Sequence, residues 1–201
     1  MKNKALVVID LQNDITKNYK EIIETTNQAI DWAAANNMDV VYIRHNNLSA
    51  GTRTFKPDTH GAEFVPELKI VSDHIFTKTK SNALTSEEFA AFIQARSITE
   101  FFITGADATA CVKSTCYNMT KAGFAVHVLS DCITSYDKKK LPEMLAYYAG
   151  RGCAVHKLSE VMYQACPDGK VQFSKNTLSN TGSGLSVSRE RNMRGSLKRQ
   201  S

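Results

Sequence analysis

Three side chains with complementary chemistry stand at the ends of apolar runs that are far apart in the sequence. Asp10 directly follows the run ALVVI, Lys78 follows the run HIFT, and Cys111 follows a turn of small residues behind the run EFFIT. A thiol can act as a nucleophile, a carboxylate can accept its proton, and an ammonium can balance the charge of the carboxylate. We therefore expect a hydrolytic centre if the fold brings these three residues together.

Cys111 stands where a helix is expected to begin, after the small residues Gly105 to Ala110. The first turn of a helix carries unpaired N–H groups and the positive end of the helix dipole, which favour a thiolate over a thiol. The same N–H groups could hold the negative oxygen of a tetrahedral intermediate, at roughly 3 kcal/mol per donor. A buried structural role is the alternative, and it suits the other four cysteines better: Cys116, Cys132, Cys153 and Cys166.

Asp10 needs a cationic partner, because burial at a strand end raises the proton affinity of a carboxyl group. The sequence offers Lys78 and Lys80 as candidates. Lys80 suits the surface, whereas Lys78 directly ends its apolar run and can reach inward. The alternative role for Asp10 is that of a turn cap.

Several classes of function lack support in the sequence. The five histidines lie in separate segments without the spacing of a metal site, and there is no glycine-rich nucleotide loop, so we expect no metal and no cofactor. No apolar run approaches the roughly 20 residues that span a bilayer, so we expect no membrane partner. An odd number of cysteines without CxxC pairs and the lack of a signal-peptide pattern predict a cytoplasmic protein.

Six short apolar runs are typical of strands buried on both faces of a parallel sheet: residues 5–9, 39–43, 74–77, 100–104, 125–129 and 153–156. Four segments of helical length and period lie between them: residues 19–36, 86–95, 111–122 and 141–149. Thr85 and Glu88 have the spacing of a capping box before the second helix, and Gly123 is placed to end the third.

Strands that alternate with helices predict an α/β fold, namely a three-layer, doubly wound, Rossmann-like sandwich around a mostly parallel six-stranded sheet. Ligands of such sheets bind beyond the carboxyl ends of the strands, which is where Asp10, Lys78 and Cys111 fall. Residues 44–72 lack a clear period, and we expect this long loop to cover a pocket.

The composition predicts one globular domain followed by a basic segment. A chain of 201 residues, with 42% hydrophobic and 22% charged residues, fits a single core. The net charge of +5 is concentrated in residues 170–201, which hold seven Lys or Arg against one acid. We expect a domain over residues 1–169 and a basic, disordered tail over residues 170–201. The tail lacks aromatic residues interleaved with its charges, so we expect no nucleic-acid partner.

Three separated segments together resemble one known family. VVIDLQND at residues 7–14 resembles a D-x-Q-x-D pattern, KTKSNAL at residues 78–84 resembles a K-x-x-x-[SN]-A-F pattern, and GADATACV at residues 105–112 resembles the turn around a nucleophile. In this order and spacing they resemble the isochorismatase-like cysteine hydrolases, a superfamily that includes nicotinamidases, carbamoylsarcosine amidohydrolases, ureidoacrylate hydrolases and streptothricin hydrolases. The resemblance covers about residues 4 to 165.

This resemblance implies a role for each segment. It makes Asp10 the general acid/base, selects Lys78 as the cation of the triad, and makes Cys111 the nucleophile. It also implies an oxyanion hole formed by the backbone N–H groups of Asp107 and Cys111, and a cis peptide bond between Ala106 and Asp107. The candidate residues of a substrate pocket are Gln12, His60 and Ala108.

The chain also departs from the family pattern. Ile15 and Leu84 stand where phenylalanine is usual, and Ala108 stands where threonine is usual. The D-x-H metal motif that nicotinamidases carry after the second strand is missing from RHNN at residues 44–47. This argues against a nicotinamidase and against a bound metal.

The resulting expectation is a cysteine-dependent hydrolase of a small amide, ureide or carbamoyl compound, acting through a thioester and forming a homodimer or homotetramer. One alternative is vinyl-ether hydrolysis of isochorismate, although family members with that activity generally lack the cysteine. The other is a non-catalytic, redox-responsive binding module.

Overall fold

The computed structural model describes residues 3–164 of the chain. Its strands are β1 (Lys4–Ile9), β2 (Asp39–His45), β3 (Ile75–Lys78), β4 (Glu100–Gly105), β5 (Ala125–Ile133) and β6 (Ala154–His156). Its α-helices are α1 (Asn13–Thr16), α2 (Ile23–Ala35), α3 (Glu87–Arg96), α4 (Cys111–Lys121), α5 (Leu141–Gly150) and α6 (Leu158–Gln164). The predicted tail 170–201 and the predicted domain end at residue 169 lie outside the described residues.

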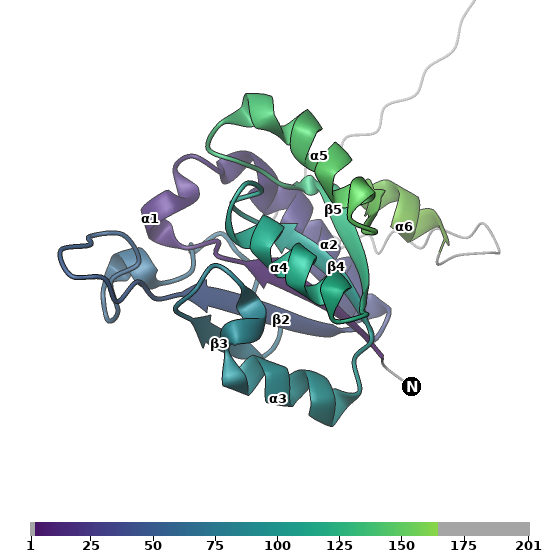
Figure 1. Ribbon diagram of the computed structural model, residues 1–201, viewed down its shortest axis with the longest axis horizontal. Helices are drawn as coiled ribbons and strands as arrows, with labels where there is room; N and C mark the ends of the chain where they lie inside the picture. The colour runs from purple at the N-terminus through teal and green to yellow at the C-terminus, as the bar shows by residue number, and fades with distance from the viewer. Residues whose placement is uncertain (1–2, 165–201) are drawn as a thin grey trace, which may run out of the picture. The chain divides into compact units, whose positions relative to one another are not determined.

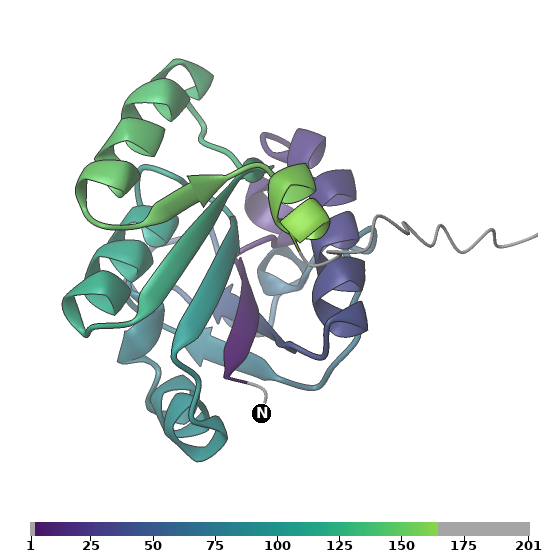
Figure 2. The same cartoon turned by 90° about the vertical axis from the view of Figure 1, so that its right-hand side faces the viewer.

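The strands form one parallel sheet in the order β3-β2-β1-β4-β5-β6. Helices α3, α4 and α5 cover one face of the sheet, and helices α2 and α6 cover the other (Figure 1, Figure 2). The predicted three-layer α/β sandwich is therefore confirmed. Because β1 and β4 are neighbours from which the chain winds outward in opposite directions, the switch point of the sheet lies between their carboxyl ends.

Strand β1 shows why the strands are continuous apolar runs in the sequence. Val7 and Ile9 pack with the helices on one face, whereas Leu6 and Val8 pack with the helices on the other, and all four are 0% exposed. Since successive side chains of a strand point to opposite faces, a central parallel strand must be apolar at every position. Each such burial contributes roughly 1.5–3 kcal/mol, which fixes β1 in the middle of the sheet.

Two strands extend two or more residues beyond the ends of their apolar runs, and both extensions lie at the carboxyl edge of the sheet. β2 continues through Arg44 and His45, and His45 pairs with Lys78 of β3. β5 continues to Ile133, which pairs with Gly105 of β4 after a register shift. The sequence pattern did not indicate the extension of β2, because the residues become polar there while the ladder of hydrogen bonds to β3 continues.

The helices differ from the predictions in two kinds of feature. The short helices α1 and α6 were not predicted, and the predicted capping box is wrong. Ser86 is the N-cap of α3 and its side chain makes no capping hydrogen bond, while the Thr85 hydroxyl donates to the Asn82 carbonyl at 2.6 Å. Gly123 does follow the end of α4 with a φ of +86°, as expected of a helix terminator. None of the described helices has the length and apolar character needed to cross a bilayer.

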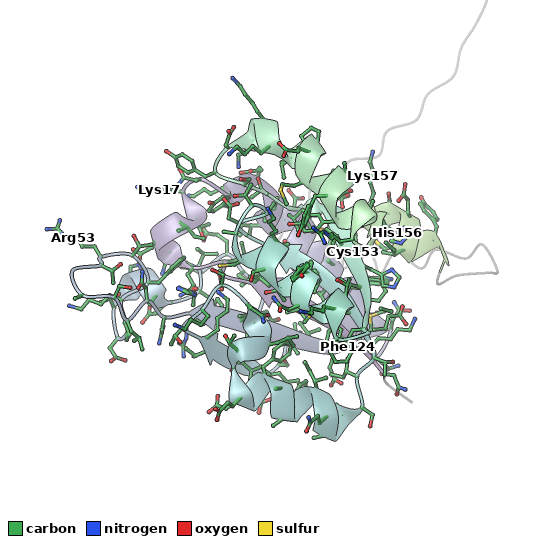
Figure 3. The ribbon with its side chains drawn as sticks, viewed as in Figure 1. Lys17, Arg53, Phe124, Cys153, His156 and Lys157 are labelled. Atoms are coloured by element: carbon green, nitrogen blue, oxygen red, sulfur yellow. The ribbon has the colours of Figure 1, made fainter. Side chains whose placement is uncertain are left out.

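The segment between β2 and β3 is irregular apart from a short 3-10 turn, His60–Ala62, as expected for the long loop. Arg53 lies in this loop and points away from the sheet (Figure 3). The base of the loop returns to the carboxyl ends of β1 and β2, because Asn13 N–H donates to the Glu63 carbonyl at 2.9 Å. The loop therefore flanks the edge of the sheet where the predicted reactive residues lie.

Candidate active site

The carboxyl edge of the sheet brings together the three residues predicted to react. Asp10 follows β1, Lys78 ends β3, and Cys111 opens α4 after the turn that follows β4. Lys78 Nζ lies 2.8 Å from Asp10 Oδ2 and 3.4 Å from Cys111 Sγ. Three side chains from separate segments of the sequence are thus in contact in the fold.

The Lys78 ammonium is enclosed by acceptors. The Lys78 side chain is 0% exposed and that of Asp10 is 1% exposed. Besides Asp10 and Cys111, the ammonium contacts His45 Nδ1 at 2.9 Å. An ammonium has three N–H donors and no acceptor, so these three contacts satisfy it completely. Such pairing is necessary, because a buried charge without partners costs several kcal/mol.

The backbone around Asp10 has little freedom to move. Asp10 has a φ of +54°, a left-handed conformation that aspartate adopts more readily than most residues, and its N–H donates to the Ile43 carbonyl at 3.0 Å. Gly105 lies beside it with a φ of +109°, and a Cβ there would overlap the Ile9 carbonyl oxygen. The Asp10 oxygen Oδ1 is buried and has no hydrogen-bond partner among the described residues. One carboxylate oxygen is thus held by Lys78, and the other can take a proton.

The surroundings of Cys111 disfavour the thiolate, whereas its place at a helix start predicted that they would favour it. Burial and the charge of the Asp10 carboxylate raise the pKa of the Cys111 thiol to about 12, although the Lys78 ammonium acts in the opposite direction. The desolvation of the sulfur therefore outweighs the cation beside it. It follows that a nearby group must accept the thiol proton when the sulfur reacts.

The turn before Cys111 is held by the carboxylate of Asp107. This carboxylate accepts hydrogen bonds from five donors: the N–H and hydroxyl of Thr109, the hydroxyls of Tyr19 and Ser135, and the N–H of Tyr136. Burial alone would raise the pKa of Asp107, but these hydrogen bonds together lower it. The peptide bond between Ala106 and Asp107 is cis, as the resemblance implies.

Two N–H groups of this turn are free. Those of Asp107 and Cys111 donate to no protein acceptor in the described part of the chain. Their neighbours are paired, since Ala108 N–H donates to the Thr134 carbonyl at 2.9 Å and Val112 N–H donates to the Asp107 carbonyl at 3.1 Å. The N–H groups expected to form an oxyanion hole are therefore not used by the described residues.

The Gln12 side chain binds backbone groups of two segments, and its predicted place in a substrate pocket stays a prediction. Its side chain is fully buried; the amide donates to the carbonyls of His45 at 2.9 Å and Ala62 at 2.7 Å, and it accepts from His45 N–H at 2.8 Å. Asp14 acts similarly, accepting from Phe55 N–H at 2.6 Å. These two side chains attach the long loop to the ends of β1 and β2.

The other two candidate pocket residues, Ala108 and His60, differ in burial, and their part in a substrate pocket stays a prediction. Ala108 is fully buried, and its carbonyl accepts a hydrogen bond from the Tyr148 hydroxyl. The His60 side chain is 80% exposed and pairs with Glu63 at 3.3 Å. Ala108 thus belongs to the support of the nucleophile turn, and His60 belongs to the loop surface.

His45 is the residue at the centre that the sequence did not identify. Its predicted strand ended at Ile43, so His45 was placed in the long loop rather than at a strand end. Asp10 was found by inspecting the polar residues that directly follow an apolar run. The same rule, extended to the second residue after the run, would have found His45.

The ligand atoms of Asp10, His45 and Cys111 lie within 4.8 Å of one another, which by atom type could suit a metal ion. The Lys78 ammonium, however, is within hydrogen-bond distance of all three residues. A divalent ion held between these atoms would lie against the ammonium, and the two cations would repel each other. The residues as placed therefore do not fit a metal ion.

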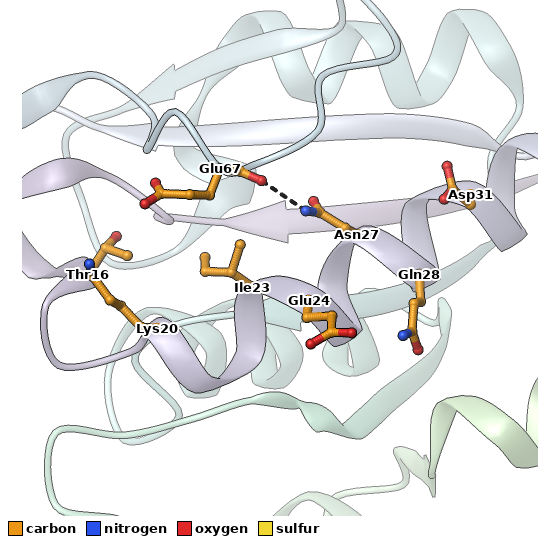
Figure 4. Close-up of a pocket in the computed structure, with 8 residues that line it drawn as sticks. All are labelled: Thr16, Lys20, Ile23, Glu24, Asn27, Gln28, Asp31 and Glu67. Atoms are coloured by element: carbon orange, nitrogen blue, oxygen red, sulfur yellow. Dashed lines mark hydrogen bonds between the residues drawn. The ribbon is translucent and has the colours of Figure 1, made fainter. Parts of the chain in front are cut away.

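A groove of about 470 Å³ lies along α2, with Glu24, Asp31 and Glu67 among the residues that line it. Asn27 spans part of it and donates to the Glu67 carbonyl at 2.8 Å (Figure 4). None of Asp10, Lys78 and Cys111 lines this groove, and its described lining includes no cysteine and no histidine. It is separate from the reacting centre.

Comparison with protein families identifies the family. The family model for the isochorismatase domain matches residues 4–160, a range that includes every described strand and also Asp10, Lys78 and Cys111. The chain belongs to the isochorismatase family. None of the curated proteins matches it in sequence.

Solved structures share the fold of this isochorismatase domain at low sequence identity. A cysteine hydrolase from Pseudomonas syringae pv. phaseolicola 1448A is 18% identical, with a TM-score of 0.73 over 81% of this chain and 92% of that chain. An isochorismatase-like hydrolase from Alkaliphilus metalliredigens is 20% identical, with a TM-score of 0.73 over 82% and 99%. A pyrazinamidase from Pyrococcus horikoshii, solved in complex with zinc, is 23% identical, with a TM-score of 0.70 over 78% and 99%. The chain thus has the fold of the cysteine hydrolases of the isochorismatase family.

Proposed function

We propose that this protein is a cysteine-dependent hydrolase that cleaves the C–N bond of a small amide, ureide or carbamoyl compound through a thioester intermediate. The observation that carries the proposal is the contact of one buried ammonium with both the Asp10 carboxylate and the Cys111 sulfur. A nucleophile, a base and a cation in mutual contact are what acyl transfer to sulfur requires.

In the acylation step, Cys111 Sγ forms a bond with the carbonyl carbon while its proton moves to Asp10. Oδ1 of Asp10 is the acceptor, because Oδ2 is held by Lys78. Because burial raises the pKa of the Cys111 thiol, the sulfur needs Asp10 to accept its proton when it reacts. The electron pair of the carbonyl moves onto its oxygen, where the free N–H groups of Asp107 and Cys111 stabilise it.

The intermediate then collapses as the C–N bond breaks and Asp10 passes its proton to the leaving nitrogen. The acyl group remains on Cys111 as a thioester. Water next attacks the thioester carbonyl and gives a proton to Asp10, and the C–S bond breaks as that proton returns to the sulfur. The products are an amine or ammonia and an acid, and Lys78 keeps Asp10 ionised at the start of each cycle.

Two points favour a C–N substrate over isochorismate. The Cys111 sulfur has the partners that a nucleophile needs, whereas family members that cleave isochorismate generally lack this cysteine. Pyrazinamidase, by its name an amidase, has the same fold. A redox-sensing role fits less well, because sensor cysteines are accessible and have a low pKa, while burial raises that of Cys111.

A substrate screen tests the proposal. Small amides, ureides, carbamoyl compounds and isochorismate are offered to the wild type, to Cys111→Ala and to the control Cys132→Ala, since Cys132 is a buried cysteine outside the centre. We expect a C–N compound to be hydrolysed equally by the wild type and Cys132→Ala, and only at background rate by Cys111→Ala. Turnover of isochorismate alone, or full turnover by Cys111→Ala, would overturn the proposal.

A further inference from the structure

His45 contacts the reacting lysine but takes no part in the steps described above. His45 and Lys78 are register partners in the neighbouring parallel strands β2 and β3, so their side chains leave the sheet on the same face. The next residue strengthens this pairing, because Asn46 N–H donates to the Lys78 carbonyl at 2.8 Å. The distance of 2.9 Å from His45 Nδ1 to Lys78 Nζ therefore follows from the ladder of the sheet.

The position of the imidazole ring is fixed from two further sides. Gln12 binds both the N–H and the carbonyl of His45, which holds its backbone at the strand end. The ring of Phe55 lies against the imidazole, with centroids 5.4 Å apart and planes at 67°. Phe55 is itself held through its N–H by Asp14. The chain thus uses the two polar residues Gln12 and Asp14 to place one ring beside the lysine.

The imidazole acts as a neutral acceptor. An ammonium only donates hydrogen bonds, so His45 Nδ1 must carry a lone pair and the ring proton must be on Nε2. Burial and the Lys78 ammonium lower the pKa of His45 below its ordinary value, and the Asp10 carboxylate opposes them only in part. His45 therefore adds an acceptor to the centre at neutral pH without adding a second positive charge.

We propose that His45 is a positioning residue that directs the Lys78 ammonium toward Cys111 and Asp10. With three acceptors around it, the ammonium has one orientation in which every N–H is satisfied. Without His45, one N–H of a fully buried ammonium would lack a partner, and the group would turn away from the sulfur to find one. The effect of His45 on catalysis rests on the proposed hydrolase function, whereas its contact with the Lys78 ammonium does not.

A measurement on the wild-type protein tests the arrangement without any substrate or variant. Nitrogen-15 NMR of the imidazole rings, followed from about pH 5 to 8 where histidine ordinarily titrates, reports which ring nitrogen carries the proton. We expect the pKa of His45 to lie below the ordinary value for histidine, so that at neutral pH the ring is neutral and Nδ1 carries no proton. A protonated Nδ1 at neutral pH would overturn the proposal.

Two variants test the effect on the sulfur. His45→Asn keeps an acceptor oxygen close to the place of Nδ1, whereas His45→Phe keeps the ring shape and removes the acceptor. We expect His45→Phe to slow alkylation of Cys111 about tenfold and to lower kcat with little change in KM, and His45→Asn to recover most of both. Alkylation of Cys132, which lies outside the centre, should not change in either variant.

If His45→Phe and His45→Asn change the alkylation rate of Cys111 by the same factor, His45 serves only the packing and the proposal is overturned. The same holds if a variant changes the alkylation rates of Cys111 and Cys132 equally. The NMR and alkylation results do not depend on turnover. If the substrate screen fails and the NMR result is as expected, only the hydrolase function is rejected. If the screen succeeds and the NMR result differs from the expected one, only the role of His45 is rejected.

Discussion

Cys111 and Cys132 are two thiols with the same raised proton affinity and different neighbours. Burial raises the pKa of each to about 12, with Asp10 adding to the effect at Cys111 and Asp131 at Cys132. Only Cys111 has the contact with Lys78 and the free N–H groups of the turn. The pair therefore separates the effect of thiol acidity from the effect of the catalytic arrangement.

This pair gives a prediction for simple alkylation, which requires a thiolate. Because a raised pKa leaves little thiolate at neutral pH, iodoacetamide should modify Cys111 and Cys132 slowly, and both rates should keep rising with pH above about 9, where an ordinary thiol levels off. Peptide mapping by mass spectrometry at a series of pH values measures both rates. A Cys111 rate that levels off near neutral pH would show a resting thiolate, and Asp10 would then not be needed as the base.

The buried ion pair gives a prediction for stability. Lys78→Met keeps much of the side-chain volume but leaves the Asp10 carboxylate buried without its cation, which should lower the free energy of unfolding by about 3–5 kcal/mol. The control is Lys69→Met, because Lys69 and Asp31 form a pair with side chains 44% and 60% exposed, and pairs of this kind contribute at most about 1 kcal/mol. Urea unfolding measures both variants. Equal losses would mean that Lys78 is not buried as described.

At the scale of the elements, the long loop depends on small contacts with the carboxyl ends of β1 and β2. A Cβ at Gly61 would overlap the Asp14 carboxylate, whereas one at Gly150 would meet open space. Gly61→Ala should push Asp14 aside, release Phe55 N–H and speed proteolysis of residues 46–59. Gly150→Ala should leave the protein as stable as the wild type or slightly more so. Limited proteolysis compares the two, and loop cleavage at the wild-type rate in Gly61→Ala would contradict this account.

The strand pattern of the sequence was sufficient to predict the sheet and to place Asp10, Lys78 and Cys111 at its carboxyl edge. Asp10, Lys78 and Cys111 each stand directly behind an apolar run or its tight turn, so the rule for carboxyl ends applies to them. His45 was missed because β2 extends two polar residues past its apolar run, and only the pairing with β3 shows that extension. Gln12 was given a pocket role because the sequence shows a polar side chain near the centre but not the backbone groups that use it.

At the scale of the whole molecule, the two core clusters lie between Ala5 and Val161. A chain that ends at Lys157 loses Leu158 and Val161, which are 3% and 6% exposed, and should lose at least about 2 kcal/mol of the free energy of unfolding. Urea unfolding of this chain and of the full chain measures the loss, and equal stability of the two would contradict it.

Assembly and location stay predictions for the whole chain. We expect a homodimer or homotetramer, which light scattering of the full chain can measure. The cytoplasmic location and the lack of a nucleic-acid partner likewise rest on the sequence alone.

The most direct measurement is the rate of covalent labelling at neutral pH. The reagent is a small electrophilic amide analogue that reacts only when a nucleophile attacks its carbonyl-type carbon. We predict that Cys111 takes one label, that Cys132 with its equal pKa takes none, and that Asp10→Asn slows labelling at least about 100-fold. Labelling that persists in Cys111→Ala, or that affects Cys111 and Cys132 alike, would contradict a reacting centre built from Asp10, Lys78 and Cys111.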